Sequence, residues 1–263
     1  MNVIETIKAR SSVRTYDKEA KRDYTLLESK IAIINSTTGP FGNQIKVSLV
    51  KSTEDSSEMK LGTYGMIKNA EDYLVVTCNQ ESNVLIDLGY LFEEVILYAT
   101  SLGLGTVWMA GTFSRKHFKD AIELKQDEIL PIVSPVGIKS ERKSFVDKYI
   151  AKPKTHVRKD FGLLFTDING TSLEYDKSID YMQALEMVRL APSGMNKQPW
   201  RVVVDGNNFH FYTFAEKRGV EIDLGIALNH FDKTMNQLGH TGNITITPND
   251  YKDNYMFTWS LEK

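Results

Sequence analysis

Cysteine, net charge of one sign and long apolar runs are all scarce in this chain of 263 residues. The only cysteine, Cys78, excludes an intrachain disulfide and a cysteine-built zinc site. Lys and Arg number 32 against 34 Asp and Glu, so the formal net charge of -2 provides no overall positive field for a nucleic acid or an anionic membrane. The most apolar long window, 84–111, is interrupted by Asp87, Glu93 and Glu94, which leaves no bilayer span of about 20 apolar residues. We expect neither a nucleic-acid partner nor a membrane.

The remaining composition is that of an ordinary folded protein. Hydrophobic residues make up 41% and charged residues 25%, values that argue against disordered and collagen-like classes. The length suits one large domain or two closely packed small ones, and no linker rich in Ser, Gly and Pro is visible. Residues 1–16 carry several charges and no continuous apolar stretch, so no export signal is expected. Together with the single cysteine, this favours a cytoplasmic location.

Two stretches of the chain repeat each other at a fixed distance. Asp87-Leu88-Gly89 begins the first stretch, which ends at Leu102-Gly103, and Asp223-Leu224-Gly225 begins the second, which ends at Leu238-Gly239. The apolar positions correspond at spacings that place them on one face of an α-helix. They are Leu88, Leu91, Phe92, Val95, Ala99 and Leu102 in the first stretch, and Leu224, Ala227, Leu228, Phe231, Met235 and Leu238 in the second. Each glycine lies where a left-handed residue would end the helix.

The segments upstream of these helices also match. Amphipathic helices are predicted at about 24–34 and 179–190, and each is followed by a loop, 39–44 or 191–200, and by a β-branched run. Further strands are predicted at 73–77, 132–138, 209–214 and 256–261. The pattern predicts a duplicated α+β unit whose halves, 1–165 and 166–263, share one core. The alternative is a chance likeness of two amphipathic helices.

A cluster of cationic and hydroxyl side chains follows a short N-terminal helix. Arg10-Ser11-Ser12-Val13-Arg14 places two guanidinium groups and two hydroxyl groups within five residues. Arginine offers fixed donors that can bind a phosphate in a bidentate manner, and serine adds small neutral donors. The segment is typical of a phosphate monoester site, although a turn-capping Ser12 and solvated arginines would give the same pattern.

The loop between Pro192 and Trp200 combines polar side chains with two prolines. Ser193, Asn196 and Gln198 offer donors and acceptors that suit the edge of a flat heterocycle. A capped connection between a helix and a strand is the alternative interpretation. The counterpart loop 38–44 lacks both the serine after its proline and the closing Pro-Trp pair, which indicates that the two loops differ in role.

With these motifs, the sequence resembles the FMN-dependent nitroreductase family, specifically a fused branch in which one chain mimics the usual two-subunit enzyme. The resemblance also includes the helix from Asp87, the segment 104–111 and the basic stretch near Arg158. It implies a nitroreductase-like α+β fold, an α/β sandwich, duplicated so that one chain corresponds to a nitroreductase dimer. It also implies one tightly bound FMN per chain, because the second half has no copy of the Arg10–Arg14 motif.

The resemblance assigns roles to particular residues. Arg10, Ser11 and Ser12 would hold the phosphate or ribityl end of FMN, with His156 and Arg158 as helpers, while Arg14 approaches the N1/C2 edge of the ring. The segment whose backbone meets flavin N5 would be Met109, Ala110 and Gly111, with Ala110 in place of an acidic residue of some members. The second half would border the ring with Pro192, Ser193, Met195, Asn196 and Gln198.

The activity that follows is a two-step oxidoreduction. NADH or NADPH would give hydride to flavin N5 and leave, and a nitroaromatic, quinone or similar electron-poor small molecule would then accept it. No side chain is needed as a nucleophile, and Arg14 would stabilise negative charge on the flavin. The alternatives are a flavin-binding sensor or carrier without turnover, and a flavin-consuming or dehalogenating member of the same fold. A monomer is favoured, with a dimer as the alternative.

The histidines show no metal-ligand spacing, and we expect no metal site. They are predicted to be surface or helix-capping groups, and their positions are His117, His156, His210, His230 and His240.

Overall fold

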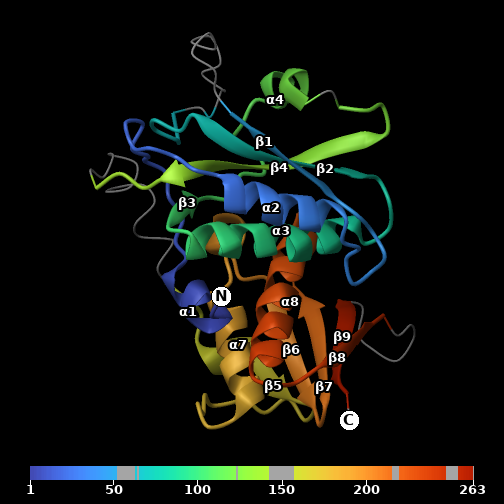
Figure 1. Ribbon diagram of the computed structural model, residues 1–263. Coiled ribbons are helices and arrows are strands. Elements are labelled where there is room, and N and C mark those ends of the chain that lie inside the picture. Colours follow the sequence, from blue (N-terminus) through green and yellow to red (C-terminus); the bar gives the residue numbers. More distant parts are fainter. Residues whose placement is uncertain are drawn as a thin grey trace.

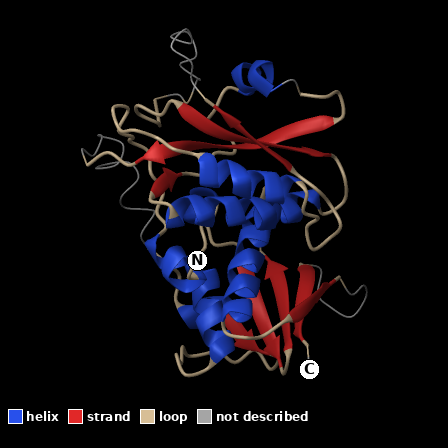
Figure 2. Ribbon diagram, in the orientation of Figure 1, coloured by secondary structure: helices blue, strands red, loops and turns tan. Residues whose placement is uncertain are grey.

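The protein is built from two β-sheets with its long helices between them, as the computed structural model in Figure 1 shows. The structure describes residues 1–51, 63, 65–122, 124–141, 157–214, 219–246 and 254–262. Figure 2 shows most of the helices below the upper sheet and beside the lower one, with one short helix above the upper sheet. This mixed arrangement confirms the predicted α+β class.

The first sheet has the strand order β1-β2-β4-β3, with antiparallel neighbours. Its strands are β1 (Lys46–Val50), β2 (Asp72–Asn79), β3 (Leu104–Thr106) and β4 (Glu128–Ile138). All but the last residue of β2 are buried, since α2 (Thr25–Asn35) and α3 (Val84–Ser101) lie on one face of the sheet and α4 (Arg115–Ile122) on the other. A strand covered on both faces reads as a continuous apolar run, which is why residues 73–77 were recognisable as a strand in the sequence.

The second sheet has the order β5-β6-β7-β9-β8, and only its β5-β6 pair is parallel. Its strands are β5 (Phe165–Asp167), β6 (Trp200–Asp205), β7 (Asn208–Thr213), β8 (Gly242–Thr245) and β9 (Tyr255–Leu261). The helices α7 (Asp180–Leu190) and α8 (Val220–Gln237) lie beside it, and the short α6 (Phe161–Leu164) leads into β5. The predicted strands 209–214 and 256–261 are confirmed to within one residue at each end.

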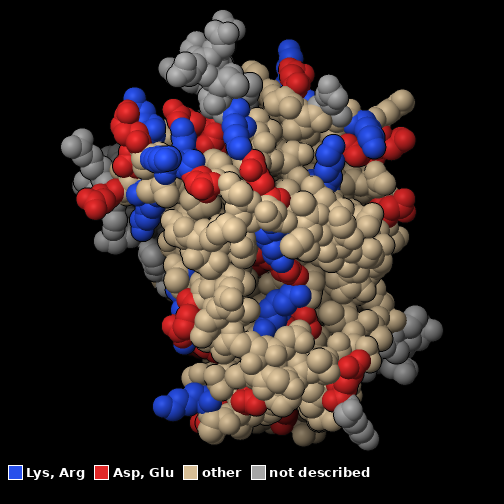
Figure 3. All heavy atoms as spheres, viewed as in Figure 1, with Lys and Arg blue, Asp and Glu red and all other residues tan. Residues whose placement is uncertain are grey.

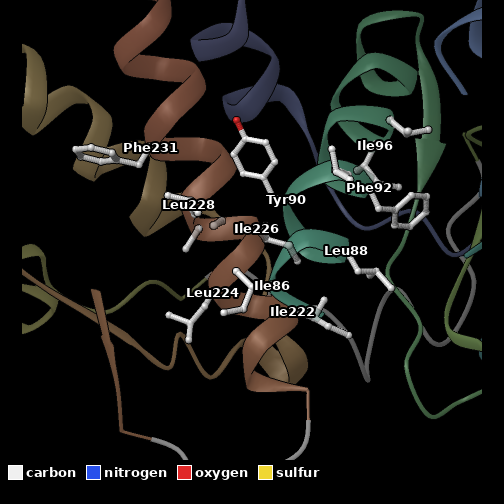
Figure 4. Close-up of a cluster of buried hydrophobic side chains, with 14 of the residues drawn as sticks. Ile86, Leu88, Tyr90, Phe92, Ile96, Ile222, Leu224, Ile226, Leu228 and Phe231 are labelled. Carbon is white, nitrogen blue, oxygen red and sulfur yellow. The ribbon is translucent and has the colours of Figure 1, made fainter. Parts of the chain in front are cut away.

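The two central helices repeat each other as the sequence predicted. Both α3 and α8 have 18 residues and begin 136 positions apart, at Val84 and Val220. Gly103 and Gly239 follow them with φ angles of 78° and 91°, the left-handed conformation expected just after a helix. This pair makes the most extensive contact between elements of the fold, and Figure 4 shows apolar side chains gathered around it, among them Ile86, Leu224 and Leu228.

The point of closest approach is formed by two glycines at equivalent positions. A Cβ atom on Gly89 would lie 2.2 Å from the carbonyl oxygen of Ile222, and one on Gly225 would lie 2.0 Å from that of Ile86. Each glycine also approaches the other, because both hypothetical Cβ atoms fall within 3.0 Å of the opposite glycine Cα. The repeated Asp-Leu-Gly therefore marks the crossing, where only hydrogen fits between the backbones.

One cluster of buried residues extends through both sheets and the helices between them. It includes Leu74 and Leu91 of the first half and Trp200, Phe211 and Phe231 of the second. A separate cluster lies on the outer face of the first sheet, around Phe118 of α4. The predicted boundary between residues 165 and 166 falls within β5 and stays a prediction.

The outer surface carries both signs of charge. Figure 3 shows Lys and Arg interspersed with Asp and Glu on the face viewed. Among the helices in the described part of the chain, none combines the length and the apolar character needed to cross a bilayer.

Replacing either crossing glycine by alanine is expected to destabilise the protein, because the methyl group must displace the backbone of the other helix. For Gly89→Ala and Gly225→Ala we expect a loss of roughly 2 to 4 kcal/mol in the free energy of unfolding, despite the better helix propensity of alanine. Urea denaturation would measure it. Gly111→Ala is the control, since its methyl meets nothing within 4 Å. Parent-like stability of both crossing variants would contradict this account.

Candidate functional site

The N-terminal motif connects the helical layer to the first sheet. The helix α1 (Val3–Ala9) packs against α3, α7 and α8, and Arg10 caps its C-terminal end. Ser12 then pairs with Thr106 of β3, and the Val13 amide donates to the Thr106 carbonyl at 2.9 Å. Elements of both halves therefore meet where the motif begins.

Arg10 is partly exposed there, but two nitrogen atoms of its guanidinium are buried without the hydrogen bonds they require. Its Nε and Nη1 atoms are inaccessible to solvent and have no hydrogen-bond partner among the residues that the structure describes. Burial lowers the pKa of Arg10, the charge of Glu93 raises it, and the charge of Arg14 lowers it. Buried guanidinium donors without partners are strongly unfavourable. A negatively charged group that accepts hydrogen bonds therefore fits this position.

Arg158 adds a third guanidinium to the same region. Burial, followed by the charges of Arg10 and Arg189, lowers its pKa to about 10. Its Nη2 atom donates to the Leu190 carbonyl at 2.8 Å, and its Nη1 atom donates to the Ala191 carbonyl and to Asn196 Oδ1. Arg158 therefore joins the end of α7 to the following loop and lies within electrostatic range of Arg10.

The loop 191–199 has an unusual backbone. Met195, Asn196 and Gln198 adopt φ angles of 53°, 55° and 48°, a region that non-glycine residues rarely occupy. The Met195 side chain is 78% exposed, whereas Gln198 is 2% exposed. Such local strain persists only where the surrounding contacts hold the backbone, and it is frequent at ligand sites.

Those contacts use the side chains predicted to border the ring. Asn196 accepts from Arg158 and donates to the Val157 carbonyl, while Gln198 Oε1 accepts from the Lys159 amide at 2.9 Å. Ser193 Oγ accepts from the Gln198 amide at 2.9 Å. In this structure Asn196 and Gln198 hold the segment 157–159 against the loop. Of the other residues predicted to border the ring, Pro192 and Ser193 are partly exposed and Met195 is exposed.

An aspartate at the start of each central helix holds the loop of its own half. Both carboxylate oxygens of Asp223 accept from the Gly194 amide, at 3.0 and 3.1 Å, and burial raises the pKa of Asp223 to about 7. Asp87 accepts from the Phe41 and Asn43 amides and from Asn43 Nδ2, each at 2.9 Å, and burial raises its pKa as well. Asp223 thus holds the loop 191–199 through one donor, whereas Asp87 holds the loop 39–44 through three donors.

The segment predicted to meet flavin N5 is partly used by the fold. The Met109 amide donates to the Val133 carbonyl and the Val133 amide donates back, both at 3.0 Å. Met109 is buried, so neither its amide nor its side chain is available for a cofactor. Ala110 and Gly111 are exposed, which narrows the prediction for this segment to those two residues.

A buried pair of polar side chains was not predicted from the sequence. Glu93 of α3 accepts from Trp108 Nε1 at 2.9 Å and pairs with His230 Nε2 of α8, also at 2.9 Å. The prediction that the histidines are surface or capping groups is wrong as to the surface for two of them, since His230 is 0% exposed and His210 is 2% exposed. The position of Glu93 within the mostly apolar helix α3 was the sequence feature that could have indicated a buried polar contact. His156 lies outside the described residues.

The fold and the arginine cluster define an α+β protein with a candidate site for an anionic ligand. The family model described as "Putative TM nitroreductase" matches residues 2–235, and the chain therefore belongs to that nitroreductase family. The search of curated proteins found no match.

A similar solved structure has the same fold over nearly its whole length. A putative nitroreductase from Thermotoga maritima has a TM-score of 0.64 and 20% identity, with 99% of this chain and 94% of that chain covered. A nitroreductase from Desulfitobacterium hafniense with bound FMN has a TM-score of 0.44 and 22% identity, with 54% of this chain and 92% of that chain covered. A nitroreductase family protein from Clostridium difficile has a TM-score of 0.46 and 20% identity, with 60% of this chain and 94% of that chain covered.

The raised pKa of Asp223 leads us to expect that the stability of the protein depends on pH. Its pKa near 7 in the folded state exceeds the value of about 4 in an unfolded chain. The folded state therefore binds more protons between these values, and this contribution to stability is present at low pH and is lost as the pH rises through about 7. Asp223→Asn should reduce the fall in melting temperature between about pH 5 and about pH 8.

The equivalent substitution in the first half is the comparison. Asp87→Asn leaves one amide oxygen for three donors and should lower the melting temperature throughout this pH range. A parent-like pH slope in Asp223→Asn would show that this carboxylate is not the titrating group.

Proposed function

We propose that the protein binds one FMN per chain between its halves and acts as an NAD(P)H-dependent oxidoreductase. The acceptors proposed are nitroaromatic compounds, quinones or similar electron-poor molecules. Family membership supports the general class, and the bound FMN of the Desulfitobacterium hafniense protein supplies the name of the cofactor.

The observation that carries the proposal is that Nε and Nη1 of the Arg10 guanidinium are buried and have no hydrogen-bond partner among the described residues. A phosphate monoester carries up to two negative charges and several acceptor oxygens, so it would satisfy the Nε and Nη1 donors and offset the repulsion from Arg14 and Arg158. Ser11 and Ser12, adjacent in sequence, add hydroxyl donors. These groups fit the phosphate end of FMN.

The other residues of the site would shape the space for the ring. Arg14 favours negative charge near its guanidinium, and the exposed Ala110 and Gly111 leave their backbone accessible. Arg158, Asn196 and Gln198 fix the loop that carries Ser193 and Met195. FMN bound here would supply the hydride-accepting and hydride-donating chemistry, while the protein supplies position and charge.

The first test is a visible absorption spectrum of the purified protein, repeated under anaerobic conditions after NADH and then NADPH. The flavin released on denaturation gives the stoichiometry. We expect close to one FMN per chain and loss of the flavin absorbance with at least one donor, followed by its return on addition of a quinone. Tight binding without bleaching would favour a sensor or carrier, and a protein that takes up no FMN would refute the proposal.

Replacing Arg10 should change the affinity for FMN more than it changes the stability of the ligand-free protein. Arg10→Ala is expected to weaken FMN binding by about 10- to 100-fold, since charge-assisted hydrogen bonds to the phosphate are lost. The ligand-free melting temperature should change little, because two buried donors without hydrogen-bond partners are removed with the side chain. Fluorescence titration and thermal unfolding measure the two effects. Arg22→Ala is a control, since Arg22 pairs with Glu71 and Asp72.

Arg14 is expected to act on the reaction more than on affinity. Arg14→Ala should slow bleaching by NADH or NADPH by about tenfold or more, with a smaller change in the dissociation constant of FMN. Stopped-flow absorbance and fluorescence titration distinguish the two effects. Equal bleaching rates in the variant and the parent would remove Arg14 from this role.

A further inference from the structure

Two cationic side chains that the proposed flavin site does not use lie where the loop 191–199 joins β6. Lys159 Nζ donates to the Gln198 carbonyl oxygen at 3.1 Å, and Arg201 Nη1 donates to the Trp200 carbonyl oxygen at 2.6 Å. Because these two acceptors are only two residues apart in the chain, the two cations lie close together. Both side chains are partly exposed, so a ligand can reach them from solvent.

No carboxylate balances the charges of this pair in the part of the chain that the structure describes. The ion pairs there include neither Lys159 nor Arg201, whereas Arg189 of α7 pairs with Glu186 at 2.6 Å. The two cations donate to carbonyl oxygens, and most of their N–H donors are left for a ligand. Burial and then the charge of Arg201 lower the pKa of Lys159, which agrees with their proximity. An anion bound here would offset the repulsion between them.

An exposed aromatic ring lies against the same pair. The Arg201 guanidinium is 5.6 Å from the centroid of the Phe214 ring, and the Phe214 amide donates to the Pro199 carbonyl oxygen at 3.2 Å. The Phe214 side chain is 69% exposed, whereas every other phenylalanine in the described ranges is buried or partly buried. Aromatic faces and guanidinium planes stack on flat heterocycles such as nucleobases. The cations and the ring therefore offer anion binding and stacking side by side.

This group of residues adjoins the candidate flavin site through the loop 191–199. Arg158 donates to the Ala191 carbonyl oxygen at the start of the loop, and the next residue, Lys159, donates to the Gln198 carbonyl oxygen near its end. The exposed residues predicted to border the ring lie between these two contacts. A long ligand with one end at the ring would extend along the loop and bring its other end to Lys159.

We propose that Lys159, Arg201 and Phe214 bind the adenosine phosphate end of the NAD(P)H donor. A nucleotide combines the two features that these residues fit, a phosphate group and a flat base. The two cations donate to phosphate oxygens, and the adenine stacks on the Phe214 ring or on the Arg201 guanidinium. This inference rests on the proposed function for the identification of the nucleotide as the hydride donor.

Calorimetric titration with 2′,5′-ADP, which corresponds to the adenosine end of NADPH, tests the two parts of the site separately. Arg201→Ala should weaken binding by about tenfold, since charge-assisted hydrogen bonds to phosphate are lost. Phe214→Ala should weaken it by about fivefold or more through the loss of stacking, and should leave the affinity for inorganic pyrophosphate unchanged. Because the Phe214 side chain is exposed, its replacement tests the site with little risk to folding.

Two further variants locate the binding. Lys51→Ala is the matched control, because Lys51 also lies over an aromatic ring, 5.9 Å from that of Tyr24, but pairs with Glu28 at 2.6 Å. We expect this control and Arg10→Ala to bind 2′,5′-ADP as the parent does. Weaker binding in Arg10→Ala with parent-like binding in Arg201→Ala would assign the nucleotide to the flavin phosphate site and overturn the inference.

Bleaching of the FMN-loaded protein distinguishes the phosphates of the donor. Arg201→Ala should raise the donor concentration that gives the half-maximal rate by about tenfold and leave the limiting rate unchanged, because Arg201 binds the donor without acting on the reacting atoms. A rise with NADPH alone assigns the cations to the 2′-phosphate, and an equal rise with NADH assigns them to the pyrophosphate. Unchanged half-maximal concentrations of both donors would overturn the inference.

The outcomes also distinguish this inference from the proposed function. If the parent binds FMN and is bleached, while Arg201→Ala and Phe214→Ala bind 2′,5′-ADP as the parent does, the nucleotide site fails and the cofactor assignment stands. If the parent takes up no FMN, the cofactor assignment fails, and the titrations with 2′,5′-ADP still decide whether these residues bind a nucleotide.

Discussion

The close crossing of the two central helices is the constraint on which the rest of the structure depends. Gly89 and Gly225 let the backbones of α3 and α8 approach until only hydrogen atoms fit between them. Because the two helices belong to different halves, their crossing fixes how the halves meet. Each helix also packs against the sheet of its own half. The crossing therefore joins the apolar side chains of both halves into the main cluster of buried residues.

The same crossing brings polar side chains into the interior. Glu93 and His230 lie on the two crossing helices, and each is a hydrogen-bond partner of the other there. Around them lie Arg10 at the end of α1 and Trp108 before an exposed backbone segment. The candidate site is therefore a product of the interface between the halves, with contributions that neither half provides alone.

Much of the fold could be predicted because local patterns carry it. The helical spacing of apolar residues located α3 and α8, and runs with the composition of buried strands located β2, β4, β7 and β9. The resemblance to nitroreductases, based on the motif at Arg10 and the loop after Pro192, is confirmed at the level of the family. The short β5 and β8 escaped prediction, since three or four residues give too little periodicity to detect.

The sequence by itself determined the repeat, the class of fold and the presence of a phosphate-type motif, because each is encoded in neighbouring residues or in a fixed spacing. Only the tertiary structure decided how the polar side chains are used. Asn196 and Gln198 are occupied by the segment 157–159, and the Met109 amide is occupied by Val133. Glu93 meets His230 from 137 residues away. Hydrogen-bond partners so distant in the chain are set by packing, and no local pattern records them.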